Sequence, residues 1–180
     1  MADFLTAFAY SMTNEEPAIT APSYGQVHTD NDGGLVRFGI NSNSYPFLKQ
    51  GTFFTSMVNS EAIRTSQNVY RAYIWNEIKG DTITSQSVAS KIFDMAVNQG
   101  VVEASKLVQR AVGVNVDGVI GSITIQAINA ASESVLLKDL IYWELWLIQL
   151  IIDHNPADNK YEEGWTVRAE KLPVSQEVPA

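Results

Sequence analysis

The 180-residue sequence contains no cysteine and only two histidines, His28 and His154. A chain without thiols forms no disulfide and no thiolate metal site, and two imidazoles are too few for the common zinc centres. We therefore expect no metal and no other cofactor. If the chain is catalytic, we expect its catalytic groups to be mainly carboxylates.

Clusters of basic residues are also missing. The chain has 12 Lys and Arg against 20 Asp and Glu, a formal net charge of −8 at pH 7. Nucleic acids and anionic membrane surfaces attract proteins that carry clustered Lys and Arg. This composition argues against nucleic acid as a partner.

Neither a signal peptide nor a membrane span is recognisable. The opening MADFLTAFAYSM has no basic n-region and no small-residue cleavage site, so we expect a protein that is cytoplasmic at synthesis. The most apolar stretch, LIYWELWLIQLIID, is interrupted by Glu144 and Gln149 and is shorter than the ~20 residues that a spanning helix needs. We expect a buried helix there and no membrane insertion.

The sequence does contain enough apolar residues, 46%, for one domain with a sizeable core. Apolar spacing, capping residues and glycine stops predict a mainly helical chain. The stretch from Ala18 to about Phe47 is rich in turn formers and predicts an irregular hairpin. The first expected helix is capped by Asp3, runs to Met12 or Thr13 with Phe4, Leu5, Phe8 and Met12 on one face, and is stopped by Pro17. The other expected helices are 59–78, capped by Ser60; 85–100, ending at Gly100; 102–113; a short helix capped by Ser122 or Thr124; and 134–155.

The segment TNEEPA places two adjacent carboxylates, Glu15 and Glu16, at the expected end of the first helix. A carboxylate there faces the negative end of the helix dipole, so its pKa rises if it is also partly buried. Glycoside hydrolysis uses such a protonated carboxyl together with a second carboxylate. Asp30 and Asp32 in HTDNDGG are candidates for the second group. The alternative interpretation is an ordinary solvated helix end.

Several segments in order resemble a known family. TNEEPA is similar to a helix end that continues Asn-Glu-Gly-Gly-Tyr, and DNDGGLVRFGI to an Asp-x-Gly-Gly-x-Thr-x-x-Gly-Ile loop. VYRAYIWNEIKGD, KIFDMAVNQG, LVQRAVGVNVDGVIGSIT and EEGWTVRAEKL follow in the order of the family's later motifs. The chain thus resembles glycoside hydrolase family 108, N-acetylmuramidases found as phage endolysins and as muramidases that assist bacterial protein release.

The resemblance implies that Glu15 is the catalytic acid of a bacteriolytic muramidase, which cleaves the β-1,4 bond between N-acetylmuramic acid and N-acetylglucosamine. Asn31 stands where the family has Asp, and Val36 where it has Thr. Either Asp32 or Asp30 takes over through a shifted loop, or the second group is absent. A lytic transglycosylase and a catalytically inactive wall-binding or virion-associated protein therefore remain alternatives.

The binding cleft of such an enzyme needs aromatic faces and polar partners for sugars. We expect Tyr73 and Trp75 as aromatic contacts, with burial in the core as the alternative. Asp94 and Asn98 share one helical face and are candidates for sugar contacts or for a buried anchor of the hairpin. Arg37 is a candidate for positioning Glu15 or for meeting anionic groups of the wall polymer, with a surface role as the alternative.

The resemblance also implies a fold class and a setting. We expect a mainly α, lysozyme-like helical domain with a small irregular β-hairpin near the N-terminus. It would span residues 1–172, with a catalytic half to residue 100, a peptidoglycan-binding-like half from 101, and a flexible tail at 173–180. The expected partner is the peptidoglycan glycan strand, met by a monomer that reaches the wall after release through a holin or virion delivery.

Overall fold

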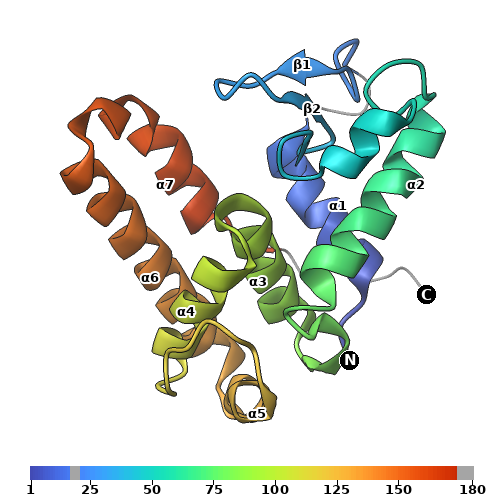
Figure 1. The fold of residues 1–180 in the computed structure, drawn as a ribbon. Coiled ribbons are helices and arrows are strands. Elements are labelled where there is room, and N and C mark those ends of the chain that lie inside the picture. Colours follow the sequence, from blue (N-terminus) through green and yellow to red (C-terminus); the bar gives the residue numbers. More distant parts are fainter. Residues whose placement is uncertain (17–20, 174–180) are drawn as a thin grey trace.

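The computed structural model describes residues 1–16 and 21–173, and it confirms a mainly α, lysozyme-like fold with a small sheet near the N-terminus. Helix α3 lies centrally: it packs against α1 on one side and against α4 and α6 on the other, and α7 lies along α6 (Figure 1). The helices are α1 (Phe4–Glu15), α2 (Asn59–Tyr70), α3 (Gln86–Gln99), α4 (Val101–Ala111), α5 (Ser122–Ala130), α6 (Glu133–His154) and α7 (Glu162–Glu170).

Short helical turns connect several of these elements. They are the 3₁₀ turns η1 (Pro46–Gln50), η3 (Gly80–Thr82) and η4 (Pro156–Tyr161), and the π-helical turn η2 (Arg71–Trp75), which continues α2. Within the described residues, no helix is both long and apolar enough to cross a membrane.

Helix α1 begins as predicted, because the Asp3 side chain accepts a hydrogen bond from the backbone N–H of Thr6 at 2.8 Å. The helix runs two residues beyond Thr13, so that Glu15 is its last residue. Leu5 is exposed, and its predicted place on the buried face is wrong. Pro17 lies outside the described residues.

The predicted stops and caps are confirmed only in part. The predicted stop at Gly100 is confirmed, because Gly100 ends α3 with a positive φ of 82°. The N-terminus of α3 is capped by Ser85, a cap that was not predicted. The predicted caps at Ser60, Ser122 and Thr124 are wrong, because α2 and α5 begin without a side-chain cap.

The small sheet has the order β1 (His28–Thr29), β2 (Leu35–Arg37), β3 (Ile40–Asn41), all antiparallel. Arg37 pairs with Ile40, so Phe38 and Gly39 form a two-residue turn. Both have positive φ, 48° and 69°, as in the type I′ turns that suit tight hairpins. This turn projects from the sheet and becomes part of the candidate site.

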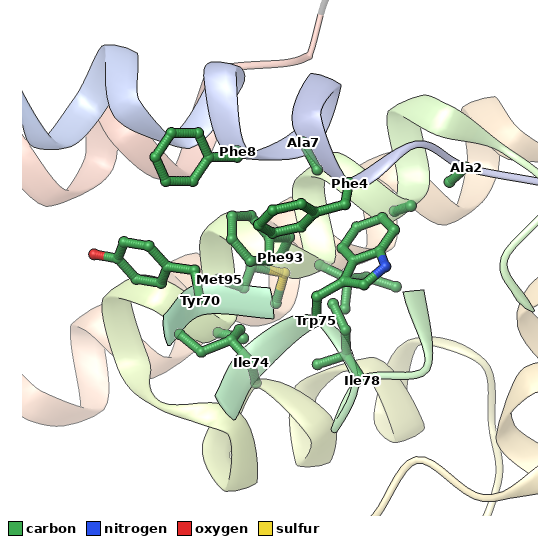
Figure 2. Close-up of a cluster of buried hydrophobic side chains, with 14 of the residues drawn as sticks. Ala2, Phe4, Ala7, Phe8, Tyr70, Ile74, Trp75, Ile78, Phe93 and Met95 are labelled. Atoms are coloured by element: carbon green, nitrogen blue, oxygen red, sulfur yellow. The ribbon is translucent and has the colours of Figure 1, made fainter. Parts of the chain in front are cut away.

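Aromatic rings fill the core between α1, the end of α2 and α3. Figure 2 shows Phe4 between Trp75 and Phe93, with ring centroids 5.7 and 5.9 Å from that of Phe4. The same continuous cluster includes Leu107 on α4 and Leu140 on α6. Both halves of the chain therefore contribute to one core.

The loop between α4 and α5 is held by the buried side chain of Gln109. Its Oε1 accepts hydrogen bonds from the N–H groups of Asp117 and Gly118, and its Nε2 donates to Asp117 Oδ1. Gln109 thus fixes the turn at Asp117 and Gly118.

Candidate functional site

Glu15 lies at the C-terminal end of α1, where its carboxylate meets Arg168 of α7. Glu15 Oε1 is 2.6 Å from Arg168 Nη2, and the Glu15 side chain is 18% exposed. Burial raises the pKa of Glu15, and the nearby Arg168 charge opposes this rise without cancelling it. Glu15 is thus a partly buried carboxyl with a raised pKa that still reaches solvent.

Arg168 is shared with a second carboxylate, Asp94 of α3. Arg168 Nε donates to Asp94 Oδ2 at 3.2 Å and Nη2 donates to Oδ1 at 2.9 Å. Asp94 is buried and also accepts hydrogen bonds from Ser11 Oγ and Asn14 Nδ2. The guanidinium therefore divides its charge between Asp94 and Glu15, and the net charge of the three groups is negative when both acids are ionised.

The end of α7 is fastened to the last turns of α1. Tyr10 donates its hydroxyl to the Lys171 carbonyl at 2.8 Å, and Lys171 Nζ donates to Asn14 Oδ1 at 2.7 Å. These contacts fix the position of Arg168 on α7 relative to Glu15 on α1.

The hairpin turn at Phe38 and Gly39 covers the other side of Glu15. A β-carbon built on Gly39 would lie 2.9 Å from Glu15 Oε2 and 2.5 Å from the Tyr70 hydroxyl. Tyr70 donates that hydroxyl to the Phe38 carbonyl at 3.0 Å, and burial raises its pKa, which keeps it protonated. Only glycine allows the turn to approach Glu15 and Tyr70 so closely.

Asp30 and Asp32 lie in the exposed turn between β1 and β2. Asn41 Nδ2 donates to both carboxylates, and the backbone N–H of Gly34 donates to Asp32 Oδ1 at 2.8 Å. The Gly34 hydrogen bond, followed by those from Asn41 and Asn43, lowers the pKa of Asp32. Asp32 is thus ionised at neutral pH, and within the described residues neither aspartate is hydrogen bonded to Glu15.

The β1–β2 turn and Glu15 lie at opposite ends of β2. Strand β2 leads from Gly34, beside Asp32, to the Phe38–Gly39 turn beside Glu15. Asn31 is exposed and Val36 is buried in the small sheet. Asn31 and Val36 differ from the family's loop pattern, and neither side chain is hydrogen bonded to Glu15.

Two predicted substrate contacts are contradicted by burial. Arg37 is 5% exposed and donates to the carbonyls of Gly25 and Phe53 and to Asn59 Oδ1, so it anchors the hairpin to neighbouring loops. Trp75 is fully buried in the core.

Tyr73 and Asn98 are exposed, as a ligand contact requires. Tyr73 is 51% exposed and packs against Tyr45 and Phe47 of the η1 region, with ring centroids 5.7 and 5.8 Å away. Asp94 is a buried anchor, as its alternative interpretation held, but it fastens α1 and α7 rather than the hairpin.

Arg168, Tyr70 and Gly39 were not predicted as site residues. Each belongs to a segment with a family-like motif, EEGWTVRAEKL, VYRAYIWNEIKGD or DNDGGLVRFGI. These motifs were the only sequence signal for the three residues. That the three lie around Glu15 depends on how α1, α2, α7 and the hairpin pack.

The described residues hold no group of three His, Asp or Glu side chains arranged to bind a metal ion. Glu16, the neighbour of Glu15, accepts a hydrogen bond from the Gly25 N–H at 3.0 Å and so has a different environment.

Comparisons with known proteins fit this geometry. Residues 24–100 match the family model described as "Glycosyl hydrolase 108", a match that begins after Glu15, and residues 103–170 match a "Predicted Peptidoglycan domain". No curated protein matches the chain. The solved structure of Brucella abortus SagA has a similar fold, with a TM-score of 0.70 and 22% identity over 92% of this chain and 88% of that one. The predicted resemblance is thereby confirmed: residues 24–100 are similar to glycoside hydrolase family 108, and the segment that follows is similar to a predicted peptidoglycan domain.

Proposed function

We propose that this protein is an N-acetylmuramidase that hydrolyses the β-1,4 bond between N-acetylmuramic acid and N-acetylglucosamine in peptidoglycan. The observation that carries the proposal is the partly buried Glu15 carboxyl, whose pKa is raised and which lies between Arg168 and the glycine turn of the hairpin. The family match to residues 24–100 supplies the reaction class.

In this mechanism Glu15 is the general acid. Its protonated form donates to the glycosidic oxygen as the bond breaks, and burial favours that form. Arg168 and Asp94 are positioning residues in this proposal, because Arg168 binds the Glu15 carboxylate and Asp94 orients Arg168. Arg168 also stabilises the carboxylate that remains after proton transfer.

We propose Asp32 as the second carboxylate, with Asp30 beside it. Hydrogen bonds from Gly34, Asn41 and Asn43 keep Asp32 ionised, as a base or a charge-stabilising group must be. Asn41 pairs with Val36 in the sheet and is two residues from Gly39, so it links this turn to the Glu15 side of the hairpin. A glycan lying along the hairpin would then meet both acids.

Exposed side chains supply the proposed glycan contacts. Tyr73, with Tyr45 and Phe47, presents aromatic rings to solvent, and such rings stack on the apolar faces of sugars. Asn98 presents an amide one helical turn beyond Asp94.

One observation favours a second candidate, a lytic transglycosylase. No carboxylate of the β1–β2 turn is hydrogen bonded to the Glu15 cluster in the described residues, and Asp32 is exposed. A transglycosylase needs only the acid, because a hydroxyl of the substrate itself attacks.

Mass spectrometry of digested peptidoglycan tests the proposal. A muramidase releases soluble muropeptides that end in reducing N-acetylmuramic acid, whereas a transglycosylase releases anhydro ends that are lighter by one water. If prolonged incubation with purified peptidoglycan releases no soluble product although the protein sediments with it, both enzymatic candidates fail and a wall-binding protein remains.

A further inference from the structure

Lys91 of α3 is a fully buried cation that has no part in the mechanism proposed above. Its side chain is inaccessible to solvent, and its ammonium forms an ion pair with the Glu144 carboxylate of α6, which is 2% exposed. Lysine is almost never buried so completely, because its charge must leave water. A buried pair of this kind commonly stabilises a protein no more than apolar residues of the same volume would. Stability alone therefore does not account for Lys91.

The Lys91 ammonium also reaches the end of α7. Its Nζ donates to the Ala169 carbonyl at 2.6 Å, and both groups are buried. In the last turn of an α-helix the carbonyl groups lack an intrahelical partner, and a cation there also lies at the negative end of the helix dipole. Lys91 thus stabilises the C-terminal turn of α7 from the side of α3.

Arg168 belongs to the same turn of α7. It directly precedes Ala169, and its guanidinium binds Asp94, which follows Lys91 by three residues on α3. Residues three apart lie on one face of a helix. One face of α3 therefore holds the end of α7 at two points: Lys91 binds its backbone, and Asp94 binds the Arg168 side chain.

The effect of Lys91 on Glu15 has to pass through Arg168. The ionisable groups that act on Glu15 or face it are Arg168 on α7, Asp94 on α3, the adjacent Glu16 and the hydroxyl of Tyr70 on α2. Lys91 is not among them. A change at Lys91 should therefore reach Glu15 by moving the guanidinium that binds its carboxylate.

We propose that Lys91 is a positioning residue of the candidate active site: it fixes the last turn of α7, so that the Arg168 guanidinium stays at the Glu15 carboxylate. Glu144 is the counter-ion that compensates for the burial of the ammonium. The inference rests on the proposed function only for the reaction in which Glu15 takes part.

The pKa of Glu15 measures this attachment whether or not the protein cleaves peptidoglycan. NMR titration of ¹³C-labelled glutamate carboxyl groups gives that pKa, and the Glu15 signal is the one missing from the spectrum of Glu15→Gln. The test variant is Lys91→Met with Glu144→Leu, which leaves no unpaired buried charge. Because a looser α7 turn weakens the stabilisation of ionised Glu15 by Arg168, the pKa of Glu15 should rise by about one pH unit.

A double-mutant cycle shows whether the effect passes through Arg168. The second background carries Arg168→Gln and Asp94→Asn, so it has no guanidinium to position and no unpaired charge at residue 94. The substitutions at Lys91 and Glu144 should leave the pKa of Glu15 unchanged in that background. A rise of the same size there would contradict positioning through Arg168.

Two controls separate positioning from a general loss of structure. Lys106→Met with Glu103→Leu makes the same replacements in an exposed ion pair on α4. Leu140→Ala removes core packing on α6, where Leu140 is fully buried, and should lower the thermal midpoint at least as much as the test variant does. Neither control should move the pKa of Glu15.

An unchanged pKa of Glu15 in the folded test variant would overturn the inference, and so would an equal rise in Leu140→Ala. If the test variant does not fold, Lys91→Gln with Glu144→Gln replaces it. The glutamine amide at residue 91 is one bond shorter than lysine and should not hold the Ala169 carbonyl in the same way, so the pKa of Glu15 should rise here as well. No rise in this variant would also overturn the inference.

Cleavage assays keep this inference separate from the proposed function. If Glu15 is the general acid, the alkaline limb of muropeptide release should move to higher pH together with its pKa in the test variant. A raised pKa in a protein whose parent form releases no muropeptide would leave the attachment intact and remove the proposed function. Cleavage by the parent together with an unchanged pKa in the test variant would do the reverse.

Discussion

The protonation of Glu15 depends on its burial and on its charged neighbours, whose effects on the pKa differ in sign. Burial raises the pKa of its carboxyl most, the Arg168 charge lowers it, and the Asp94 charge raises it again. Asp94 therefore has two functions at the residue scale. It orients the guanidinium, and it limits how strongly that guanidinium stabilises the ionised form of Glu15.

The Asp94→Asn variant should change the pH profile of cleavage. Removing the Asp94 charge lowers the pKa of Glu15 and leaves Arg168 more attractive to its carboxylate. A general acid acts in its protonated form, so the alkaline limb of the rate profile should move to lower pH. Rates of muropeptide release measured across pH, at saturating peptidoglycan, give this limb.

Asp153→Asn is the control, because Asp153 is exposed on α6 and its partner Gln149 can still bond to an amide. An alkaline limb that moves to higher pH in Asp94→Asn, or equally in both variants, would mean that Glu15 does not set it.

At the scale of elements, the hairpin turn at Phe38 and Gly39 determines how closely the sheet approaches Glu15. Gly39→Ala places an alanine in the left-handed conformation, which should destabilise the fold by about 1–2 kcal/mol. The new methyl group should also clash with Glu15 and Tyr70. We expect reduced stability and a loss of cleavage larger than the stability change explains. Thermal unfolding and the rate of muropeptide release measure the two effects.

Gly33→Ala provides a matched control for backbone strain. Gly33 has a similar φ of 77°, but a β-carbon there meets nothing within 4 Å. The Gly33→Ala variant should be destabilised by a similar amount and should keep the parent rate of muropeptide release. If Gly33→Ala and Gly39→Ala lose the same fraction of activity, the close approach of the turn to Glu15 has no catalytic role.

Local sequence signals predicted those element ends whose residues act on their own backbone. Asp3 caps α1 through the nearby N–H of Thr6, and Gly100 ends α3 by adopting a positive φ. Ser60 failed because α2 begins without a side-chain cap. Helix α7 carries no strong periodic signal, and it is held by packing on α6, so only its motif pointed to it.

At the scale of the whole molecule, the site depends on contacts between segments far apart in the sequence. Glu15 could be proposed from the sequence because a helix end and the family-like segment TNEEPA coincide there. Its partner Arg168 could not, since that ion pair exists only once α1, α3 and α7 are assembled. Arg37 was misassigned because sequence alone does not reveal that its side chain is buried, and for Trp75 the alternative of burial in the core is the correct one.

The buried pair Lys91 and Glu144 joins α3 to α6, and thereby the two halves of the chain. Both side chains are almost inaccessible, and Lys91 Nζ also donates to the Ala169 carbonyl at 2.6 Å. Glu144→Leu leaves a buried charge unpaired and should lower the free energy of unfolding by roughly 3–5 kcal/mol. The Lys91→Met/Glu144→Leu double variant should recover much of that loss. Denaturant unfolding measures both variants.

Glu103→Leu is the control, because its pair with Lys106 is exposed and should be worth about 1 kcal/mol or less. Since one core spans both halves, each variant should unfold in a single transition. Two separate transitions, or a double variant as unstable as Glu144→Leu, would contradict the coupling of the halves.

The central claim is that Glu15 donates the proton that breaks the glycosidic bond. The most direct measurement is the rate of soluble muropeptide release from purified peptidoglycan by Glu15→Gln and by its neighbour variant Glu16→Gln. Glu15→Gln should be slower by about 10²–10⁴-fold, the usual contribution of a general acid, while its fold and wall binding persist. Glu16→Gln, whose parent side chain bonds to the Gly25 N–H, should stay close to the parent rate. A Glu15→Gln protein that releases muropeptides as fast as the parent would contradict the account.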